Sequence, residues 1–302
     1  RGLGDVYKRQ VLQAQPSLVP KPAQATWGKG KFTIQPQTTI AYGDKALQPA
    51  ADYLASSLQR LTGVRPKTQR GGKGDILLQI DRKGVKGEGA YRLTVEKARI
   101  TVKGHDYGAI TSAIATLRQI TEGKEVATCQ ISDAPRFGWR GFHLDCSRHF
   151  FSVEEVEEAI DLMALYKLNR FHWHLTDDQG WRFEVKSLPE LAVKGSVRPC
   201  TVVGKNIGVG NAAGAIYDDT PETGYYTQEE MKEIVRYAEE RFITIVPEID
   251  LPGHMIAALS VYPELGCIGG PYNVWCRWGI AQDVLCAGNP KTLDFLHKVM
   301  DE

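Results

Sequence analysis

In the first part of the chain, segments with the apolar–polar period of a strand alternate with segments that have the period of a helix. Apolar residues at helical spacing predict a helix over 47–61, and Gly63 is placed to end it. Asp106 is placed to cap a second helix. Short alternations bounded by turn residues predict strands at 32–34, 39–42, 76–80, 91–95 and 100–102, the last two as a hairpin. This pattern indicates a small α+β domain.

From residue 133 the pattern changes to strands that alternate with helices. Ser152 with Glu155, and Thr227 with Glu230, form capping boxes that open two helices. Such alternation predicts a parallel sheet with right-handed crossovers. Polar residues gather at the carboxyl ends of the strands, where a (β/α)₈ barrel has its active site. The strands are predicted at 141–145, 170–175 and 243–246.

A complete barrel needs eight such units and about 250 residues, more than the region from 131 onward offers. We therefore expect a truncated (β/α)₈ barrel with about three strands, and a chain that stops in the helix beginning at Pro290. The expected organisation is a leader over 1–17, an α+β accessory domain over 18–130, and the N-terminal part of a catalytic barrel over 131–302. The leader is interpreted as an assembly artefact followed by a signal-peptide remnant.

Composition supports a folded chain of two domains. Among 302 residues, 42% are apolar and 24% charged, which is typical of a globular protein and excludes a disordered or collagen-like one. The net charge of +1 gives no reason to expect a nucleic acid partner, and no apolar run reaches the ~18–20 residues of a membrane span. Residues 1–130 carry 21 Lys and Arg against 10 Asp and Glu, whereas 131–302 carry 16 against 26. The second domain is therefore the one rich in carboxylates.

Six cysteines contain no C-x-x-C pair, which argues against a zinc ribbon. Cys267, Cys276 and Cys286 lie in one loop, where a disulfide can form if the protein is exported. Small buried or reduced thiols fit the sequence equally well, and the pairing stays open. Because residues 11–15 resemble the end of a secretory signal, we expect a periplasmic or secreted protein.

Three segments carry residues suited to chemistry. The first surrounds the strand at 141–145, and Arg148 lies just past its end. A guanidinium there has a planar fork that can bind neighbouring hydroxyls or a carboxylate. An ion pair with Asp145 or Asp178, of structural value only, explains Arg148 equally well.

The second segment follows the strand at 170–175. His172 and His174 share one face of that strand by its period of two. Asp177 and Asp178 come after it, and since adjacent carboxylates usually point apart, we expect one of them to orient a histidine or to hold a sugar hydroxyl. Alternatively, His172 and His174 are hydrogen-bonded interior residues of the barrel.

The third segment ends the strand at 243–246. Two prolines and a glycine fix a turn that brings His254 back over the strand end, near Asp250. A carboxylate bonded to one imidazole nitrogen sets the tautomer and leaves the other nitrogen to tune an acid. A structural hydrogen-bonded pair is the alternative.

In this order, the segments Trp139–Phe150, Leu168–Arg182 and Val246–His254 resemble the β-N-acetylhexosaminidases of glycoside hydrolase family 20, and the resemblance covers residues 18–302. It implies a (β/α)₈ barrel that removes terminal β-linked N-acetylglucosamine or N-acetylgalactosamine from glycans, its partners. It also implies retention of configuration through the substrate's own acetamido group, with no metal and no organic cofactor.

Carried over by this resemblance, Arg148 grips the sugar hydroxyls, Asp177 and His254 form a relay that tunes the catalytic acid, and Asp250 supports them. The family's catalytic Asp-Glu pair lies in a His-x-Gly-Gly-Asp-Glu motif that these residues lack. We therefore expect that pair beyond residue 302 and an inactive fragment. Two alternatives stay open: a metal-dependent barrel hydrolase that uses His172 and His174, and an inactive sugar-binding fragment.

Overall fold

The computed structural model describes residues 16–204 and 215–302, so nearly all of the predicted leader lies outside the described residues. The chain divides into two compact units, and each is described by itself. Among the described residues, the first comprises 16–138 with 165–167, and the second comprises 139–164 with 168–204 and 215–302.

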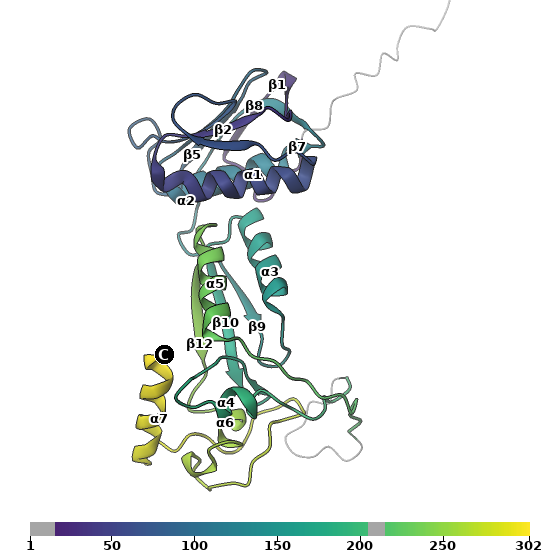
Figure 1. Ribbon diagram of the computed structural model, residues 1–302, viewed down its shortest axis with the longest axis vertical. Helices are drawn as coiled ribbons and strands as arrows, with labels where there is room; N and C mark the ends of the chain where they lie inside the picture. Colours follow the sequence, from purple (N-terminus) through teal and green to yellow (C-terminus); the bar gives the residue numbers. More distant parts are fainter. Residues whose placement is uncertain (1–15, 205–214) are drawn as a thin grey trace, which may run out of the picture. The chain divides into compact units, whose positions relative to one another are not determined.

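The N-terminal unit is one mixed sheet with two helices on one of its faces (Figure 1). The strand order is β1-β8-β5-β6-β4-β2-β3, with β7 paired to β8. β6, β4, β2 and β3 run parallel, and the other pairs are antiparallel. The elements are β1 (Gln24–Thr33), β2 (Thr39–Tyr42), η1 (Lys45–Leu47), α1 (Gln48–Thr62), β3 (Lys67–Arg70), β4 (Ile76–Ile80), β5 (Tyr91–Val95), β6 (Ile100–Gly104), α2 (Tyr107–Gln119), β7 (Thr121–Glu122) and β8 (Glu125–Asp133).

Local signals account for the elements that the sequence predicts correctly here. The Asp106 carboxylate accepts the backbone N–H of Ala109 at 2.8 Å and caps α2. Gly63 ends α1 with φ of +74°, a conformation in which a side chain would be strained. β5 and β6 form the predicted hairpin. The predictions miss β3, β7, β8 and the first part of β1. β3 and that part of β1 are exposed, mostly polar edge segments without an apolar pattern, and β7 is only two residues long.

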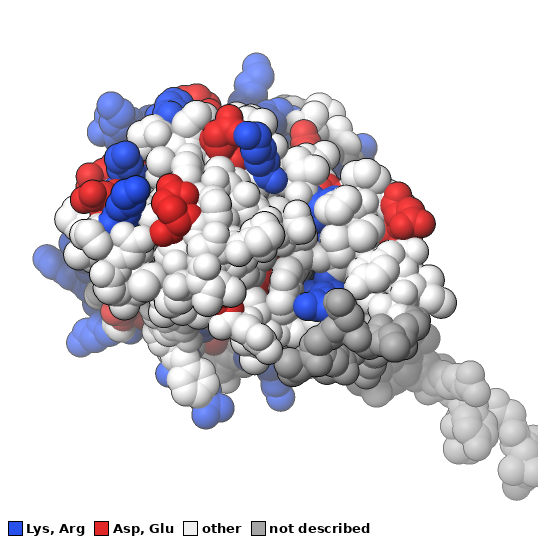
Figure 2. All heavy atoms as spheres, turned by 90° about the horizontal axis from the view of Figure 1, so that it is seen from below, with Lys and Arg blue, Asp and Glu red and all other residues white. Residues whose placement is uncertain are grey.

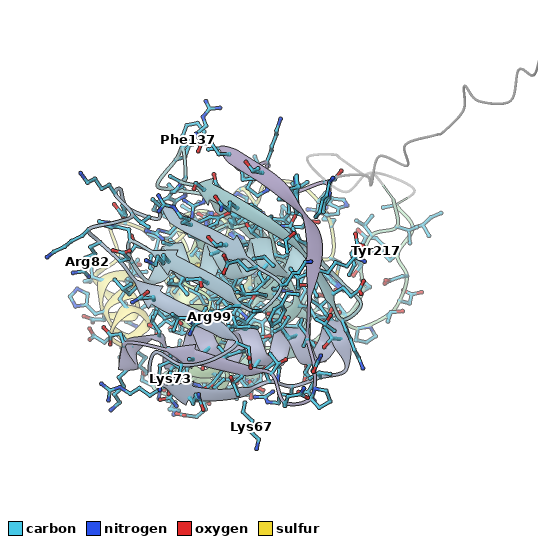
Figure 3. The ribbon with its side chains drawn as sticks, turned by 90° about the horizontal axis from the view of Figure 1, so that it is seen from above. Lys67, Lys73, Arg82, Arg99, Phe137 and Tyr217 are labelled. Carbon is cyan, nitrogen blue, oxygen red and sulfur yellow. The ribbon has the colours of Figure 1, made fainter. Side chains whose placement is uncertain are left out.

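Several basic side chains of this unit lie on its surface. Lys67 and Arg82 are exposed and lie at its rim (Figure 3). Figure 2 shows a face of the second unit, on which acidic and basic side chains are interspersed among other residues.

The second unit is built around β10. β9 and β12 pair with it in parallel, one on either side, and the short β11 pairs antiparallel with its end. α3 and α5 run alongside these strands (Figure 1). The elements are β9 (Gly141–Asp145), α3 (Val153–Leu165), β10 (Arg170–Asp177), β11 (Gly180–Trp181), α4 (Glu190–Val193), α5 (Gln228–Glu239), β12 (Thr244–Ile249), α6 (Ile256–Leu259), η2 (Pro263–Leu265) and α7 (Pro290–Asp301).

Both predicted capping boxes are confirmed. The Glu230 carboxylate accepts the N–H of Thr227 at 2.7 Å, while the Thr227 hydroxyl accepts the N–H of Glu230 at 3.2 Å. Ser152 and Glu155 make the same reciprocal bonds before α3. Each box satisfies two N–H groups that a helix start leaves without an intrahelical partner.

β12 is longer than predicted, because it continues through Pro247 to Ile249. Proline lacks the N–H that a central strand needs, so the pattern favoured an earlier end. Among the described residues β12 pairs with β10 alone, which leaves one side of β12 free to accommodate the proline.

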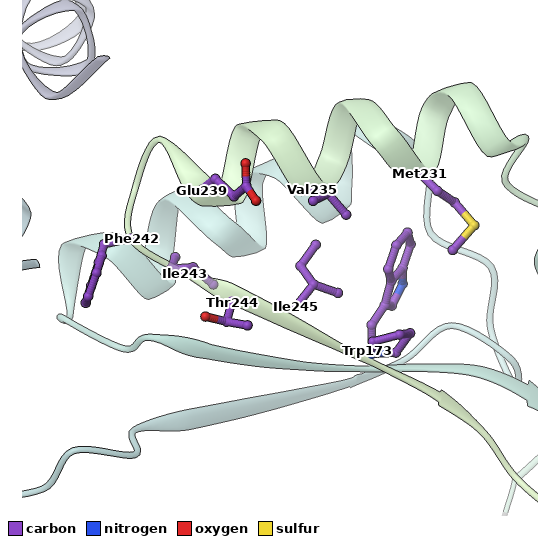
Figure 4. A pocket seen from close by; sticks show the side chains of 9 residues that line it. Trp173, Met231, Val235, Glu239, Phe242, Ile243, Thr244 and Ile245 are labelled. Atoms are coloured by element: carbon purple, nitrogen blue, oxygen red, sulfur yellow. The ribbon is translucent and has the colours of Figure 1, made fainter. Parts of the chain in front are cut away.

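The two faces of β10 differ in chemistry. Phe171 and Trp173 are fully buried on the face toward α5, where Trp173 lies near Met231 and Val235 (Figure 4). His172 and His174 lie on the other face, as the period of two predicts. Hydrophobic packing against α5 thereby assigns the histidines to the face that carries the polar cluster.

Candidate active site

Polar side chains from three parallel strands meet at the carboxyl ends of those strands. The register pairs His174 with Asp145 on β9 and with Glu248 on β12. Residues paired in a sheet point to the same side, so these three side chains share one face. The sequence predicts His174 there and pairs Asp145 with Arg148, whereas Glu248 enters the cluster only through the pairing of distant strands.

Asp177 is the centre of this cluster. Its side chain has no exposed surface. Its Oδ2 lies 2.5 Å from Arg148 Nη2 and 2.9 Å from His174 Nε2, and its Oδ1 lies 3.0 Å from His254 Nδ1. A buried carboxylate needs such partners, because desolvation otherwise makes its charge costly. The structure therefore brings together Arg148, Asp177 and His254, three of the four predicted site residues.

Arg148 is held from several directions. Its Nη1 donates to Asp145 Oδ2 at 2.8 Å, and its Nε donates to Gln179 Oε1 at 3.0 Å. Burial opposes ionisation of Asp145, but hydrogen bonds from the Arg148 backbone and guanidinium prevail and lower the pKa of this carboxyl. The ion pairs are with Asp145 and Asp177, and not with Asp178. The Arg148 side chain remains 28% exposed, so part of its fork can reach a ligand.

His254 lies in the predicted turn, with φ of +53°. Its Nδ1 is 3.0 Å from Asp177 Oδ1 and 3.2 Å from Asp178 Oδ2. Two acceptors at Nδ1 favour the proton there, which leaves Nε2 for another group. Asp250 completes the predicted set, since one carboxylate oxygen of it lies within 4.8 Å of ligand atoms of Asp177 and His254.

Asp177 and Asp178 were expected to point apart, but both carboxylates face His254. The chain turns at this point, where Asp177 pairs with Gly180 of β11, and strand alternation no longer separates neighbouring side chains. Asp178 Oδ1 also accepts the N–H of Ile256 at 3.1 Å. Burial, assisted by the charge of Asp177, raises the pKa of Asp178.

His174 links Asp177 to Glu248. Its Nδ1 lies 2.7 Å from Glu248 Oε2, and the side chain is almost completely buried. Burial alone would lower the pKa of His174, but the hydrogen bonds to Asp177 and Glu248 outweigh it and raise the pKa to about 9. The prediction of a hydrogen-bonded interior histidine is confirmed for His174. His172 also contacts Glu248, yet its side chain stays 45% exposed.

An apolar pocket lies on the opposite side of β10 and β12, beneath α5 (Figure 4). Of the residues that line it, Glu239 alone is ionisable. This composition offers no group of residues for acid–base chemistry, so the polar cluster is the candidate site.

Two pairs of thiols lie in contact in the same unit. Cys267 is hydrogen-bonded to Cys286, and Cys200 to Cys276. All six cysteines are free thiols in this structure. The sequence places Cys267, Cys276 and Cys286 in one loop but gives no sign that Cys200 joins them.

Two family models match the chain. The model described as glycosyl hydrolase family 20, catalytic domain, matches residues 137–302. The model described as glycosyl hydrolase family 20, domain 2, matches residues 15–134. The chain belongs to glycosyl hydrolase family 20, as the three sequence segments predict.

The chain is also similar in sequence to curated proteins that are named beta-hexosaminidases. The chain is 36% identical over 300 residues to a beta-hexosaminidase of Porphyromonas gingivalis, covering 95% of this chain and 37% of that protein. It is 39% identical over 254 residues to a beta-hexosaminidase of Vibrio furnissii, covering 82% and 39%. The chain thus spans about two fifths of the length of these curated relatives.

The fold is also similar to solved structures. Streptomyces plicatus N-acetyl-beta-hexosaminidase, in complex with thio-NAglucal, matches with a TM-score of 0.80 and 35% identity, covering 95% of this chain and 57% of that one. Its architecture, an N-terminal domain followed by a catalytic domain, is shared by this chain. Among the described residues, no helix is long and apolar enough to cross a membrane.

Proposed function

We propose that this chain is part of an exo-β-N-acetylhexosaminidase that removes terminal β-linked N-acetylglucosamine or N-acetylgalactosamine from glycans, with retention of configuration. The observation that carries the proposal is Asp177, which joins Arg148 and His254 at the carboxyl ends of parallel strands in a family 20 catalytic domain. The names of the relatives support the substrate class. The proposal includes two further points. β9, β10 and β12 are strands of a (β/α)₈ barrel, and the protein is exported.

In the proposed reaction the substrate's 2-acetamido oxygen attacks the anomeric carbon, while a carboxylic acid protonates the leaving oxygen. Arg148 has an exposed part of its fork with which to bind adjacent sugar hydroxyls. His254 carries its proton on Nδ1, held by Asp177 and Asp178, so Nε2 can accept a hydrogen bond from the acid and adjust its pKa. The acid and its aspartate neighbour are taken to lie outside these 302 residues.

The test is hydrolysis of 4-nitrophenyl N-acetyl-β-glucosaminide by the full gene product that carries this sequence. Asp177→Asn keeps the shape of the side chain but removes the charge that orients His254, and we expect kcat to fall by about 10²–10⁴-fold, as for loss of acid–base support. Arg148→Gln should chiefly raise KM. His297→Gln, at an exposed position on α7, is the matched control and should leave both constants unchanged.

Two further measurements examine the mechanism. A substrate with a trifluoroacetamido group has a less nucleophilic oxygen and should react more slowly, whereas equal rates would contradict substrate assistance. The 302-residue chain alone should show no turnover. Clear turnover by it would contradict the proposal that the acid lies elsewhere, and unchanged kinetics for Asp177→Asn would remove the cluster from the active site.

A further inference from the structure

A second polar group lies next to the candidate active site, on the same face of the sheet. It consists of His143 on β9, His172 on β10 and Glu248 on β12. We infer that these three side chains form a binding site for a divalent transition-metal ion of the zinc type, outside the proposed glycosidase machinery. The inference does not depend on the proposed function, because none of its support involves a sugar.

Strand pairing positions the three ligands. His172 is paired with His143 in the parallel register, and their rings lie 4.6 Å apart between centroids. Glu248 lies on β12 two residues beyond Val246, the residue paired with His172. Its Oε2 lies 2.5 Å from His172 Nε2 and 3.9 Å from His143 Nε2. One ligand atom from each of the three residues lies within 4.8 Å of the other two.

These separations are close to those around a metal ion. Ligands of a tetrahedral zinc ion lie about 2.0–2.2 Å from the metal, which places neighbouring ligand atoms roughly 3.4 Å apart. The spacing of 3.9 Å between His143 and Glu248 has to close slightly, and that of 2.5 Å between His172 and Glu248 has to open. Small side-chain rotations make both changes.

The environment of Glu248 supports a cation at this position. Its Oε2 is buried, and the imidazole nitrogens His172 Nε2 and His174 Nδ1 lie 2.5 Å and 2.7 Å from it. A metal ion bound between Glu248 and His172 takes the place of the proton that these two groups otherwise share, because both are deprotonated as ligands. Within these 302 residues His143 and His172 are about half exposed, which leaves room for a water in a fourth position.

The donor set selects the class of metal. Two imidazoles and one carboxylate form the set that holds zinc in several hydrolases. Imidazole favours Zn²⁺, Cu²⁺, Ni²⁺ and Co²⁺, whereas Mg²⁺ and Ca²⁺ prefer oxygen ligands. A neighbouring group of Asp177, Asp250 and His254 is also close enough to hold an ion. There, both oxygens of Asp177 are already engaged by Arg148, His174 and His254, so the His143 group is the better site.

The experiment measures metal binding to the untagged full gene product that carries this sequence, by calorimetry with Zn²⁺ and by the visible absorption of bound Co²⁺. We expect one equivalent to bind and to give the strong bands of a low-symmetry, four-coordinate Co²⁺ site. His143→Leu removes one ligand without touching Asp177 or His254, and it should weaken binding at least tenfold, since even second-shell substitutions cost about 10–100-fold. His297→Ala, which removes an exposed histidine on α7, should leave binding unchanged.

X-ray absorption of the Zn²⁺-loaded unmodified chain gives a readout that does not depend on whether the variant folds. It should show two imidazoles together with oxygen ligands. The inference is overturned if the unmodified chain binds Zn²⁺ no more tightly than folded His143→Leu does, if His297→Ala loses binding equally, or if absorption shows fewer than two imidazoles. Because no glycoside is present in these measurements, their outcome is independent of the hexosaminidase proposal.

Discussion

Replacement of Arg182 should destabilise the second unit and loosen the loop that carries Arg148. The Arg182 side chain has no exposed surface, and all three of its guanidinium nitrogens donate hydrogen bonds. One acceptor is the carbonyl of Ser147, the residue before Arg148. The acceptors at 2.8–3.2 Å are the carbonyls of Cys146, Ser147, Ser196 and Gly224 and the carboxylate of Glu222.

The expected size follows from two opposing contributions. Arg182→Met leaves four carbonyls without this donor, and at about 1.5 kcal/mol for each hydrogen bond from a charged group the loss is about 6 kcal/mol. Burial of the charge acts in the other direction. Burial lowers the pKa of Arg182 from 12.5 to about 10. At about 1.4 kcal/mol per pKa unit, replacement by methionine removes a cost of roughly 3 kcal/mol for burying the charge. Arg198 still pairs with Glu222, so no buried carboxylate is left alone.

The net prediction is a loss of about 3 kcal/mol in the free energy of unfolding, or a Tm lower by about 6–12 °C for a unit of this size. Urea denaturation followed by tryptophan fluorescence measures it, and an unchanged m-value is needed for the comparison. Arg236→Met is the control, because its ion pair with Glu233 is exposed and should be worth under about 1 kcal/mol. A loss for Arg182→Met no larger than that of the control would refute the reasoning.

Two further predictions concern the loop after β12 and Cys200, which contacts that loop. In a mild oxidant such as oxidised glutathione, two disulfides should close and the mass of the folded chain should fall by four hydrogens. Peptide mapping should find the pairs that are in contact, Cys267 with Cys286 and Cys200 with Cys276. Any other pairing would contradict the structure. Burial opposes ionisation of the Asp283 carboxyl, but hydrogen bonds from Tyr272 and from backbone N–H groups outweigh burial and lower the pKa of Asp283. The stabilisation is therefore present above the unfolded-state pKa and is lost as the pH falls through the folded-state value. Asp283→Asn should lower Tm at pH 7, with a deficit that shrinks steadily below about pH 4; a deficit independent of pH would show that the charge is unimportant.

Elements defined by local interactions could be predicted from the sequence. The cap at Asp106, the stop at Gly63 and the two capping boxes depend on residues only a few positions apart. The alternation on β10 is equally local. In contrast, β3 is a polar edge strand whose formation depends on pairing with β2, so its own residues carry little signal.

The same distinction applies to the candidate site. Arg148, Asp177 and His254 could be found because each follows a recognisable strand or turn, and the resemblance to family 20 gave them roles. His143 and Glu248 were not found. Glu248 meets His174 only through the register of two strands that are about seventy residues apart, and no local pattern contains that register.

Hydrophobic burial fixes this register, and thereby the site. A slip of one residue along β10 would turn Phe171 and Trp173 toward the polar face and His172 and His174 toward α5. Both aromatic side chains are fully buried, and exposing them would cost about 2–3 kcal/mol each, before any cost of burying two histidines against α5. This difference of several kcal/mol selects the register in which Asp177 faces its partners. The packing under α5 is therefore what positions the polar groups, although it contributes none of them.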